Sequence, residues 1–206
     1  YEVRNFGVPG KTALYNGLTP YVETDSYRES LTYNPDIVFI KFGTNDAGVR
    51  NNKFRHAFGE DYRKVVDAYR NLPSKPRVIL LTPIRSFMPE YHPDDVIVKE
   101  MIPIINQVAY ERGLEIINLH NIYGDKWQQS LMPDKLHPSA IGAGEIALKL
   151  YQYLTVKSVK EVDIIEKFAL QPTKEFNFYG YKGYQYNDNG VTYYIVKPNQ
   201  VAEGKP

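Results

Sequence analysis

The chain has 206 residues and a hydrophobic content of 43%, enough for one sizeable α/β domain with an appendage, and its formal charge is +1. This near-neutral charge gives no overall attraction to nucleic acid or to a membrane, and no apolar run is long enough to span a bilayer. The absence of cysteine excludes disulfides, thiolate metal sites and a cysteine nucleophile.

Strands and helices are predicted to alternate along most of the chain. The run DIVFIKF is rich in β-branched and apolar residues, which suits a strand buried on both faces. The spacing of Tyr62, Val65, Val66 and Tyr69 places them on one side of a helix. In chain order, we predict strands at residues 1–6, 36–42, 77–82 and 114–119, and helices at residues 24–32, 58–72, 94–112, 140–154 and 159–168.

This alternation favours an α/β fold with a parallel sheet and helices on both faces. In such sheets, ligands bind beyond the carboxyl ends of the strands. Three polar loops follow predicted elements at that edge: GVPG after the first strand, GTND after the second, and PDKLHP near the end of the domain. We therefore expect a functional site where these loops meet.

The last part of the chain has a different pattern. Residues 176–198 are rich in Tyr and Gly, and Asp188-Asn189-Gly190 between two alternating runs predicts a β-hairpin. We divide the chain into a main domain, residues 1–168, and residues 169–206, which form a Tyr-rich β-hairpin extension or the start of a second domain.

The stretch NFGVPGKT differs from a Walker-type phosphate loop, because Asn5 stands where the first glycine is needed and Pro9 removes a backbone donor. Backbone N–H donors in a glycine turn can also bind a different anion. Gly10 has no Cβ, so its N–H can approach a reacting carbonyl, and the side chain of Asn45 can supply a second donor. Together these groups would hold the oxyanion of a tetrahedral intermediate.

The loop Asp134-Lys135-Leu136-His137-Pro138 supplies a candidate catalytic pair. An Asp three residues before a His can accept a hydrogen bond from imidazole Nδ1, which leaves Nε2 free to take a proton from a hydroxyl nucleophile. Short Asp-x-x-His matches are common by chance. The pair gains weight because its loop is expected at the same sheet edge as Gly10 and Asn45.

The three loops together resemble the sequence blocks of the SGNH hydrolases, also called GDSL esterases. N-F-G-V-P-G resembles the second block of that family, G-T-N-D the third and D-K-L-H-P the fifth, in order and at family-like spacing over residues 1–155. The resemblance implies a flavodoxin-like three-layer α/β/α sandwich that hydrolyses esters. It places Gly10 and Asn45 in the oxyanion hole, and Asp134 and His137 in the catalytic triad.

Asp46 and Gly43 are expected to support the oxyanion loop, Asp46 through hydrogen bonds from its side chain to the backbone. We expect no organic cofactor and no metal, because a metal site needs three or four converging ligands. We interpret the other histidines, His56, His92 and His120, as surface or structural residues, and residues 50–55 (RNNKFR) as a solvated loop.

The first block of the family, a Gly-Asp-Ser motif with the nucleophile, has no counterpart here. No serine stands in a Gly-Asp context, and Ser139 is expected to cap the helix that starts near Ala140. We therefore expect that the chain is a fragment without a nucleophile and without the first strand of the sheet. A missing N-terminal segment, another chain or the tail would donate that strand, because a gap leaves backbone groups unpaired.

The expected function is serine-dependent removal of acetyl groups from a small-molecule or glycan ester. Two alternatives stay open: a non-catalytic carbohydrate-binding or interaction module, and a lipid esterase or thioesterase. The tail also resembles, more weakly, the opening hairpin of the α/β-hydrolase domains that follow esterase modules in polysaccharide-degrading bacteria. A periplasmic or secreted bacterial location is favoured over a cytoplasmic one.

Overall fold

The computed structural model describes residues 2–155, 172–178, 181–188 and 191–197. The chain forms two compact units, Tyr1–Gln152 and Tyr153–Pro206. The helix predicted at residues 159–168 and the Asn189-Gly190 turn lie outside the described residues.

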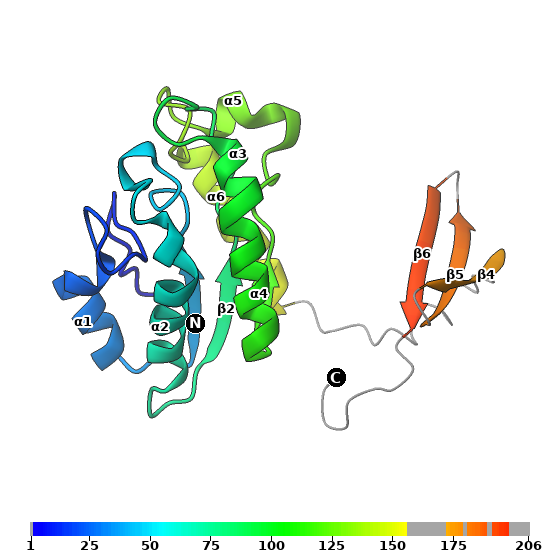
Figure 1. The fold of residues 1–206 in the computed structure, drawn as a ribbon, viewed down its shortest axis with the longest axis horizontal. Helices are drawn as coiled ribbons and strands as arrows, with labels where there is room; N and C mark the ends of the chain where they lie inside the picture. Colours follow the sequence, from blue (N-terminus) through cyan, green and yellow to red (C-terminus); the bar gives the residue numbers. More distant parts are fainter. Residues whose placement is uncertain (1, 156–171, 179–180, 189–190, 198–206) are drawn as a thin grey trace. The chain divides into compact units, whose positions relative to one another are not determined.

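A parallel sheet organises the first unit (Figure 1). Its strands are β1 (Ile37–Lys41), β2 (Arg77–Leu81) and β3 (Glu115–Ile117), in the order β1-β2-β3. These three predicted strands are confirmed. β2 is central and mostly buried, whereas β1 is mostly half-buried and, within the described residues, pairs only with β2. The prediction that β1 is buried on both faces is wrong, because β1 lies at an edge of the described sheet.

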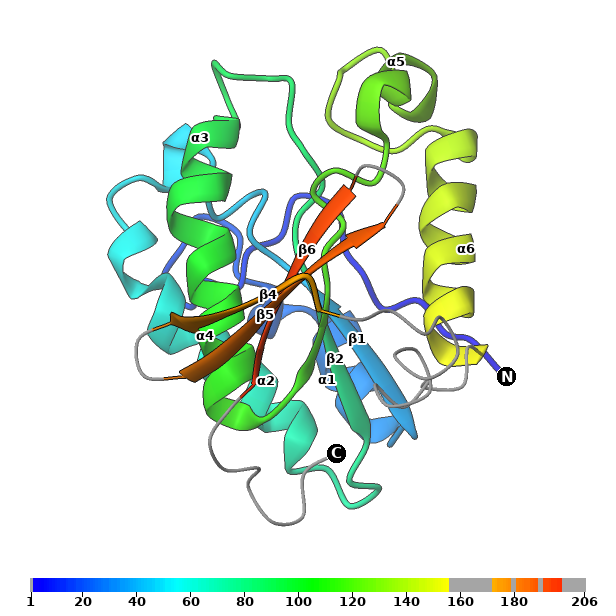
Figure 2. The ribbon, with the colours of Figure 1, turned by 90° about the vertical axis from the view of Figure 1, so that its right-hand side faces the viewer.

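Helices lie on both sides of this sheet. They are α1 (Asp25–Thr32), α2 (Phe58–Arg70), α3 (Asp94–Val96), the π-helical turn η4 (Ile97–Met101), α4 (Ile102–Arg112), α5 (Trp127–Ser130) and α6 (Ala140–Thr155), with 3₁₀ turns η1 (Tyr21–Glu23), η2 (Val49–Asn51), η3 (Arg55–Ala57) and η5 (Gly124–Lys126). α2 and α4 lie side by side on one face, and α6 lies on the other (Figure 2). None of the described helices has the length and apolar character needed to cross a bilayer.

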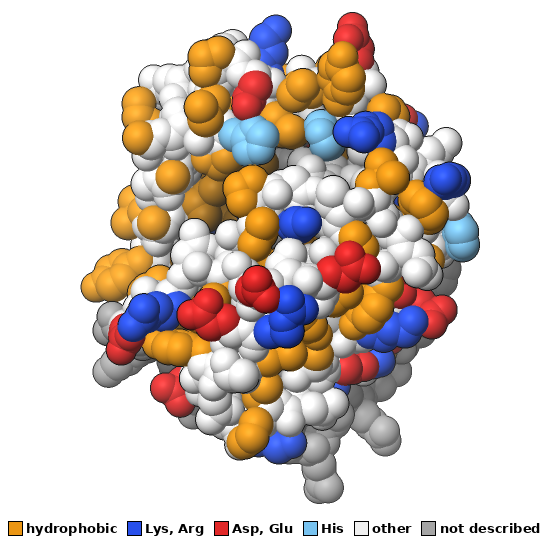
Figure 3. Space-filling view, turned by 90° about the vertical axis from the view of Figure 1, so that its left-hand side faces the viewer, with side chains coloured by type: hydrophobic (Ala, Val, Ile, Leu, Met, Phe, Trp, Pro, Cys, Tyr) orange, Lys and Arg blue, Asp and Glu red, His pale blue; other side chains and the backbone are white. Residues whose placement is uncertain are grey.

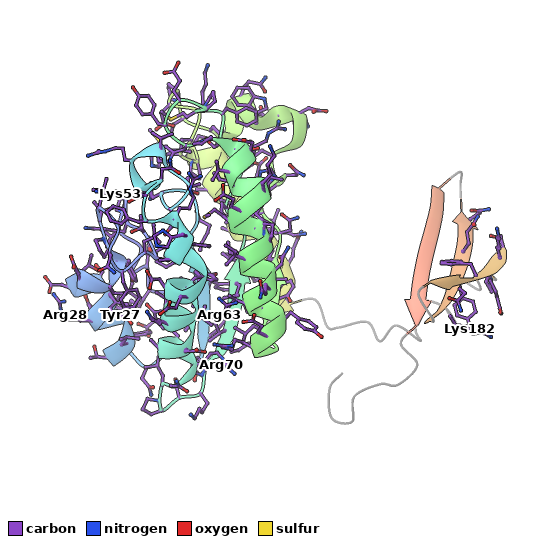
Figure 4. All side chains as sticks on the ribbon, viewed as in Figure 1. Tyr27, Arg28, Lys53, Arg63, Arg70 and Lys182 are labelled. Carbon is purple, nitrogen blue, oxygen red and sulfur yellow. The ribbon has the colours of Figure 1, made fainter. Side chains whose placement is uncertain are left out.

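The core fills the space between the sheet and the layer of α2 and α4. The four residues predicted to share one side of α2 are all buried there. Two ion pairs close the solvent side of this layer: Arg63 bonds to Glu111 at 2.7 Å, and Arg112 bonds to Asp67 at 2.9 Å. Figure 4 labels Arg63 on α2. Apolar packing inside and charge pairing outside therefore fix α2 against α4.

The segment before α1 is not a strand. Residues 2–6 have no regular structure, and Val3 is 84% exposed, so the strand predicted at residues 1–6 is wrong for the part that the structure describes. A strand needs a neighbour to pair its N–H and C=O groups, and no described strand pairs with this segment. A hydrogen bond of 2.9 Å from Tyr21 Oη to the Phe6 carbonyl holds its end.

The second unit contains an antiparallel sheet of β4 (Lys174–Phe178), β5 (Tyr181–Asp188) and β6 (Val191–Lys197). The pairing of Asp188 with Val191 confirms the predicted hairpin. The prediction omitted β4, which pairs along β5 and makes the sheet three-stranded.

Two buried tyrosines on α2 give a matched stability test. Tyr62 Oη is buried without a hydrogen-bond partner among the described residues, whereas Tyr69 Oη bonds to Ser30 Oγ at 2.7 Å. An unpaired buried hydroxyl is costly, so Tyr62→Phe should leave the free energy of unfolding unchanged or raise it by about 1 kcal/mol. Tyr69→Phe should lower it by about 1 kcal/mol. Urea unfolding measures both, and a larger loss for Tyr62→Phe would contradict this expectation.

Candidate active site

The buried carboxylate of Asp46 joins the segment after Gly10 to the loop after β1. Its Oδ1 accepts the N–H groups of Ala13 at 2.8 Å and Leu14 at 3.2 Å, and its Oδ2 accepts the N–H of Gly43 at 2.9 Å. Burial raises the pKa of Asp46 to about 6, although these N–H groups act in the opposite direction. Both oxygens face the backbone, so Asp46 holds the two segments together.

Gly43 allows this loop to turn sharply above the sheet. Its φ of +118° is unfavourable for other residues, and a Cβ would lie 2.7 Å from Pro83 Cγ. Its carbonyl accepts the N–H of Ala47 at 2.9 Å. Both backbone conformation and packing therefore require glycine here.

Asn45 and the Gly10 turn come together, although they are far apart in sequence. Asn45 Nδ2 donates to the carbonyl of Lys11 at 3.0 Å, and Lys11 follows Gly10. Gly10 has a φ of +74°, and a Cβ built on it would have no atom within 4 Å. An amide Nδ2 carries two hydrogens, so the second stays available to a ligand. The arrangement suits an oxyanion hole, a role that stays a prediction for both residues.

Asp134 and His137 form a hydrogen-bonded pair in a tight turn. His137 Nδ1 lies 2.8 Å from Asp134 Oδ2, and Asp134 Oδ1 accepts the N–H groups of His137 and Leu136, each at 3.0 Å. The backbone N–H of His137, then that of Leu136, then the imidazole lower the pKa of Asp134 to about 2. A carboxylate that stays charged favours the tautomer with a proton on Nδ1 and leaves Nε2 as the acceptor.

The turn that carries this pair is fixed at both ends. The N–H of Met132 donates to the carbonyl of His137 at 2.8 Å, and Lys135 takes a left-handed φ of +60°. Ser139 Oγ accepts the N–H of Gly142 at 3.3 Å, which confirms the predicted cap at the start of α6. The Asp134–His137 pair is therefore anchored on the first turn of α6.

The loop after β2, residues 83–92, connects the two halves of the site. The N–H of Val49 donates to the carbonyl of Tyr91 at 3.0 Å, and the N–H of Phe87 donates to the carbonyl of Lys135 at 3.1 Å. Among the described residues, no hydrogen bond joins Asn45 directly to Asp134 or His137. The connection is therefore indirect, through residues 83–92. Figure 3 shows histidine side chains on one face, some toward its upper end and one at its right-hand edge.

Two of the other histidines, His92 and His120, have partners in the fold. His92 Nδ1 lies 3.2 Å from the carbonyl of Thr44, and His120 Nε2 lies 3.0 Å from Asp94 Oδ1. Within the part of the chain that the structure describes, no group of His, Asp and Glu could hold a metal ion.

One residue of the site was missed by sequence reasoning. The prediction of a solvated loop at residues 50–55 is wrong for Asn51, which is 6% exposed and bonds to the N–H of Leu18, in the segment after Gly10, and to the carbonyl of Asn45. The run RNNKFR gives no sign of this, because burial of Asn51 depends on partners outside the run. Burial of an amide within a run of charged and polar residues has no local sequence signal.

Comparisons with known proteins give a family and a fold. Residues 1–144 match the pattern that defines the GDSL-like lipase/acylhydrolase family. A protein named acetylxylan esterase from Xylanibacter ruminicola is 34% identical over 168 residues, which cover 71% of this chain and 34% of that protein. The chain therefore spans about a third of the length of this curated relative.

Solved structures of esterases share the fold at low sequence identity. Axe2, an acetylxylan esterase from Geobacillus stearothermophilus, has a TM-score of 0.55 at 17% identity, over 74% of this chain and 71% of that chain. The acetyl xylan esterase AlAXEase has a TM-score of 0.54 at 20% identity, over 72% of this chain and 78% of that chain. These similarities confirm the predicted α/β/α sandwich.

The raised pKa of Asp46 predicts a pH-dependent stability difference from Asp46→Asn. Since the native pKa of about 6 exceeds the ordinary value of 3.8, the native state binds more protons in this window, and this contribution to stability is lost as pH rises through about 6. The wild type should exceed Asp46→Asn in free energy of unfolding by an amount that falls by about 2 kcal/mol between about pH 4 and 7. Urea unfolding across this range measures it.

Asp67→Asn is a control with the opposite sign. The hydrogen bonds from Arg112 lower the pKa of Asp67, so its contribution is present above the unfolded pKa and is lost as the pH falls. If the difference in free energy of unfolding between the wild type and Asp46→Asn stayed constant or grew with pH, the assignment of a raised pKa to Asp46 would be wrong.

Proposed function

We propose that this chain, which belongs to the GDSL-like lipase/acylhydrolase family, supplies the general base and the oxyanion hole of a serine hydrolase that removes acetyl groups from carbohydrates. The observation that carries the proposal is the 2.8 Å bond between His137 Nδ1 and Asp134 Oδ2, in a turn joined through one loop to the segment that holds Asn45. The names of the relatives, acetylxylan esterases, support a carbohydrate ester as substrate.

In this mechanism a serine Oγ attacks the acetyl carbon while His137 Nε2 takes the hydroxyl proton. Asp134 keeps the imidazole in the required tautomer and stabilises the imidazolium. Gly10 N–H and the second hydrogen of Asn45 Nδ2 donate to the oxygen that becomes negative as the new C–O bond forms. The intermediate expels the sugar alcohol, which takes the proton from His137, and water then repeats the sequence to release acetate.

We assign the nucleophile to a residue outside these 206. The hydroxyls of Ser30, Ser74, Ser130 and Ser139, the last of which lies two residues after His137, donate to backbone carbonyls. No described serine makes a hydrogen bond with His137. In this proposal, the hydroxyl that completes the Asp134–His137 pair comes from another segment.

The same segment would pair with the free edge of β1. Strand β1 has a partner on one side only within the described residues, which leaves a row of backbone N–H and C=O groups open. On α6, Ile141 and Leu148 are each 56% exposed, and an added segment that packs on this helix would bury them. We propose that a strand from the same protein or from another chain occupies this edge and carries the serine.

Turnover of p-nitrophenyl acetate tests the proposal on this chain and on a form extended upstream in its gene. We expect hydrolysis only in the extended form, and there Asn45→Ala should lower kcat by about 10²–10³ because one oxyanion donor is lost. Asn71→Ala, at an exposed position after α2, is the control and should leave kcat unchanged. Hydrolysis that survives Asn45→Ala would refute the oxyanion role, and no hydrolysis in either form would favour a non-catalytic module.

Tyr91 tests whether the substrate is a carbohydrate rather than a lipid. Tyr91 is 56% exposed beside the Asn45 loop, and its backbone is fixed by bonds to Met88 and Val49. An exposed aromatic ring on a fixed backbone can stack on a sugar, so Tyr91→Ala should raise KM for acetylated xylan by about 10-fold and leave KM for p-nitrophenyl acetate unchanged. Tyr110→Ala, an 89% exposed position on α4, is the matched control. Equal effects on both substrates would contradict the stacking role.

A further inference from the structure

The side chain of Asn51 bridges the two loops that carry the proposed oxyanion donors. Its Oδ1 accepts the N–H of Leu18 at 3.0 Å, and its Nδ2 donates to the carbonyl of Asn45 at 3.0 Å. The first bond reaches the segment that follows Gly10, and the second reaches the backbone of Asn45 itself. Asn51 therefore acts on both sides of the proposed oxyanion hole at once.

The backbone of Asn51 is fixed independently of these two bonds. Its N–H donates to the carbonyl of Gly48 at 2.9 Å, and its carbonyl accepts the N–H of Phe54 at 2.9 Å, within the turns of η2. The residue is 6% exposed, so little water competes for its amide. Because its backbone is fixed and its amide is buried, the Asn51 side chain holds Leu18 and Asn45 at a defined separation.

Two glycines allow the loops to approach this amide closely. A Cβ on Gly17 would lie 3.3 Å from Asn51 Oδ1 and 2.9 Å from Leu14 Cβ. A Cβ on Gly48 would lie 3.0 Å from the carbonyl oxygen of Asn45. Side chains at either position would push the loops away from Asn51. The bridge and the glycines beside it form one close-packed arrangement.

We propose that Asn51 is a positioning residue that holds the backbone of Asn45 and of Leu18 in the arrangement in which Asn45 Nδ2 bonds to Lys11, beside Gly10, an inference that rests on the proposed function. Asp46 already ties Ala13 and Leu14 to Gly43, but among the bonds of the described residues none joins Asp46 to Asn45 or to Leu18. Asn51 Nδ2 and the N–H of Gly48 both donate to the carbonyl of Asn45, so Asn51 contributes to the backbone position from which Nδ2 reaches the Gly10 turn. Two donors must lie within hydrogen-bond distance of one oxygen, so a small shift of either is costly.

Two substitutions at Asn51 test the bridge by kinetics in the form of the protein that hydrolyses p-nitrophenyl acetate. Asn51→Leu removes both bonds, and Asn51→Asp keeps an acceptor for Leu18 but places an oxygen against the carbonyl of Asn45. Each should lower kcat by about 10- to 100-fold with KM within about twofold, since the donors act mainly in the transition state. The same changes at the exposed neighbour Asn52 are the controls and should leave both constants unchanged.

A second measurement does not need turnover and applies to this chain directly. In Asn51→Leu, amide hydrogen exchange at Leu18 should become about 10-fold faster than in Asn52→Leu, and the NMR signals of the Asn45 side-chain amide should shift. Thermal unfolding establishes that each variant is folded. If no form hydrolyses the ester, the proposed function fails while exchange and shifts still decide the bridge. Exchange at Leu18 and Asn45 signals that match the Asn52 variants, or kcat unaltered in a folded Asn51 variant, would overturn the proposal.

Discussion

The candidate site depends on one buried carboxylate. Asp46 accepts three backbone N–H groups, and its bond to Ala13 spans 33 positions of the sequence. Without this acceptor those N–H groups would be buried unpaired, at a cost of about 1–3 kcal/mol each. The loop after β1 and the segment after Gly10 therefore behave as one unit, and the positions of the side chains that face a substrate follow from a residue that does not face it.

Local sequence patterns predicted most of the secondary structure, for a physical reason. The strands at residues 37–41 and 77–81 are short apolar runs whose composition already favours a buried strand, and α2 buries the side that its spacing predicts. The predicted strand at residues 1–6 failed because strand formation depends on a neighbour, which no local pattern specifies. The burial of β1 was overestimated for the same reason.

The site shows the same division between local and long-range information. Asp134 and His137 are three residues apart, so their spacing was sufficient to predict a pair. The bond from Asn45 to Lys11 spans 34 positions and follows from the placement of both loops at one sheet edge, which only the α/β interpretation supplied. The bonds of Asn51 and of the loop at residues 83–92 carry no motif, so only the folded arrangement reveals them.

The edge strand β1 also affects how the isolated chain behaves in concentrated solution. Ile37–Lys41 ends in one lysine and otherwise offers apolar side chains beside backbone groups that lack a partner among the described residues. Such an edge is a template for pairing between molecules, and a single charge gives little protection against it. Two copies can join there, so self-association should increase with concentration. A strand bound at this edge would compete with that self-association, which makes solubility a direct measure of whether the edge is covered.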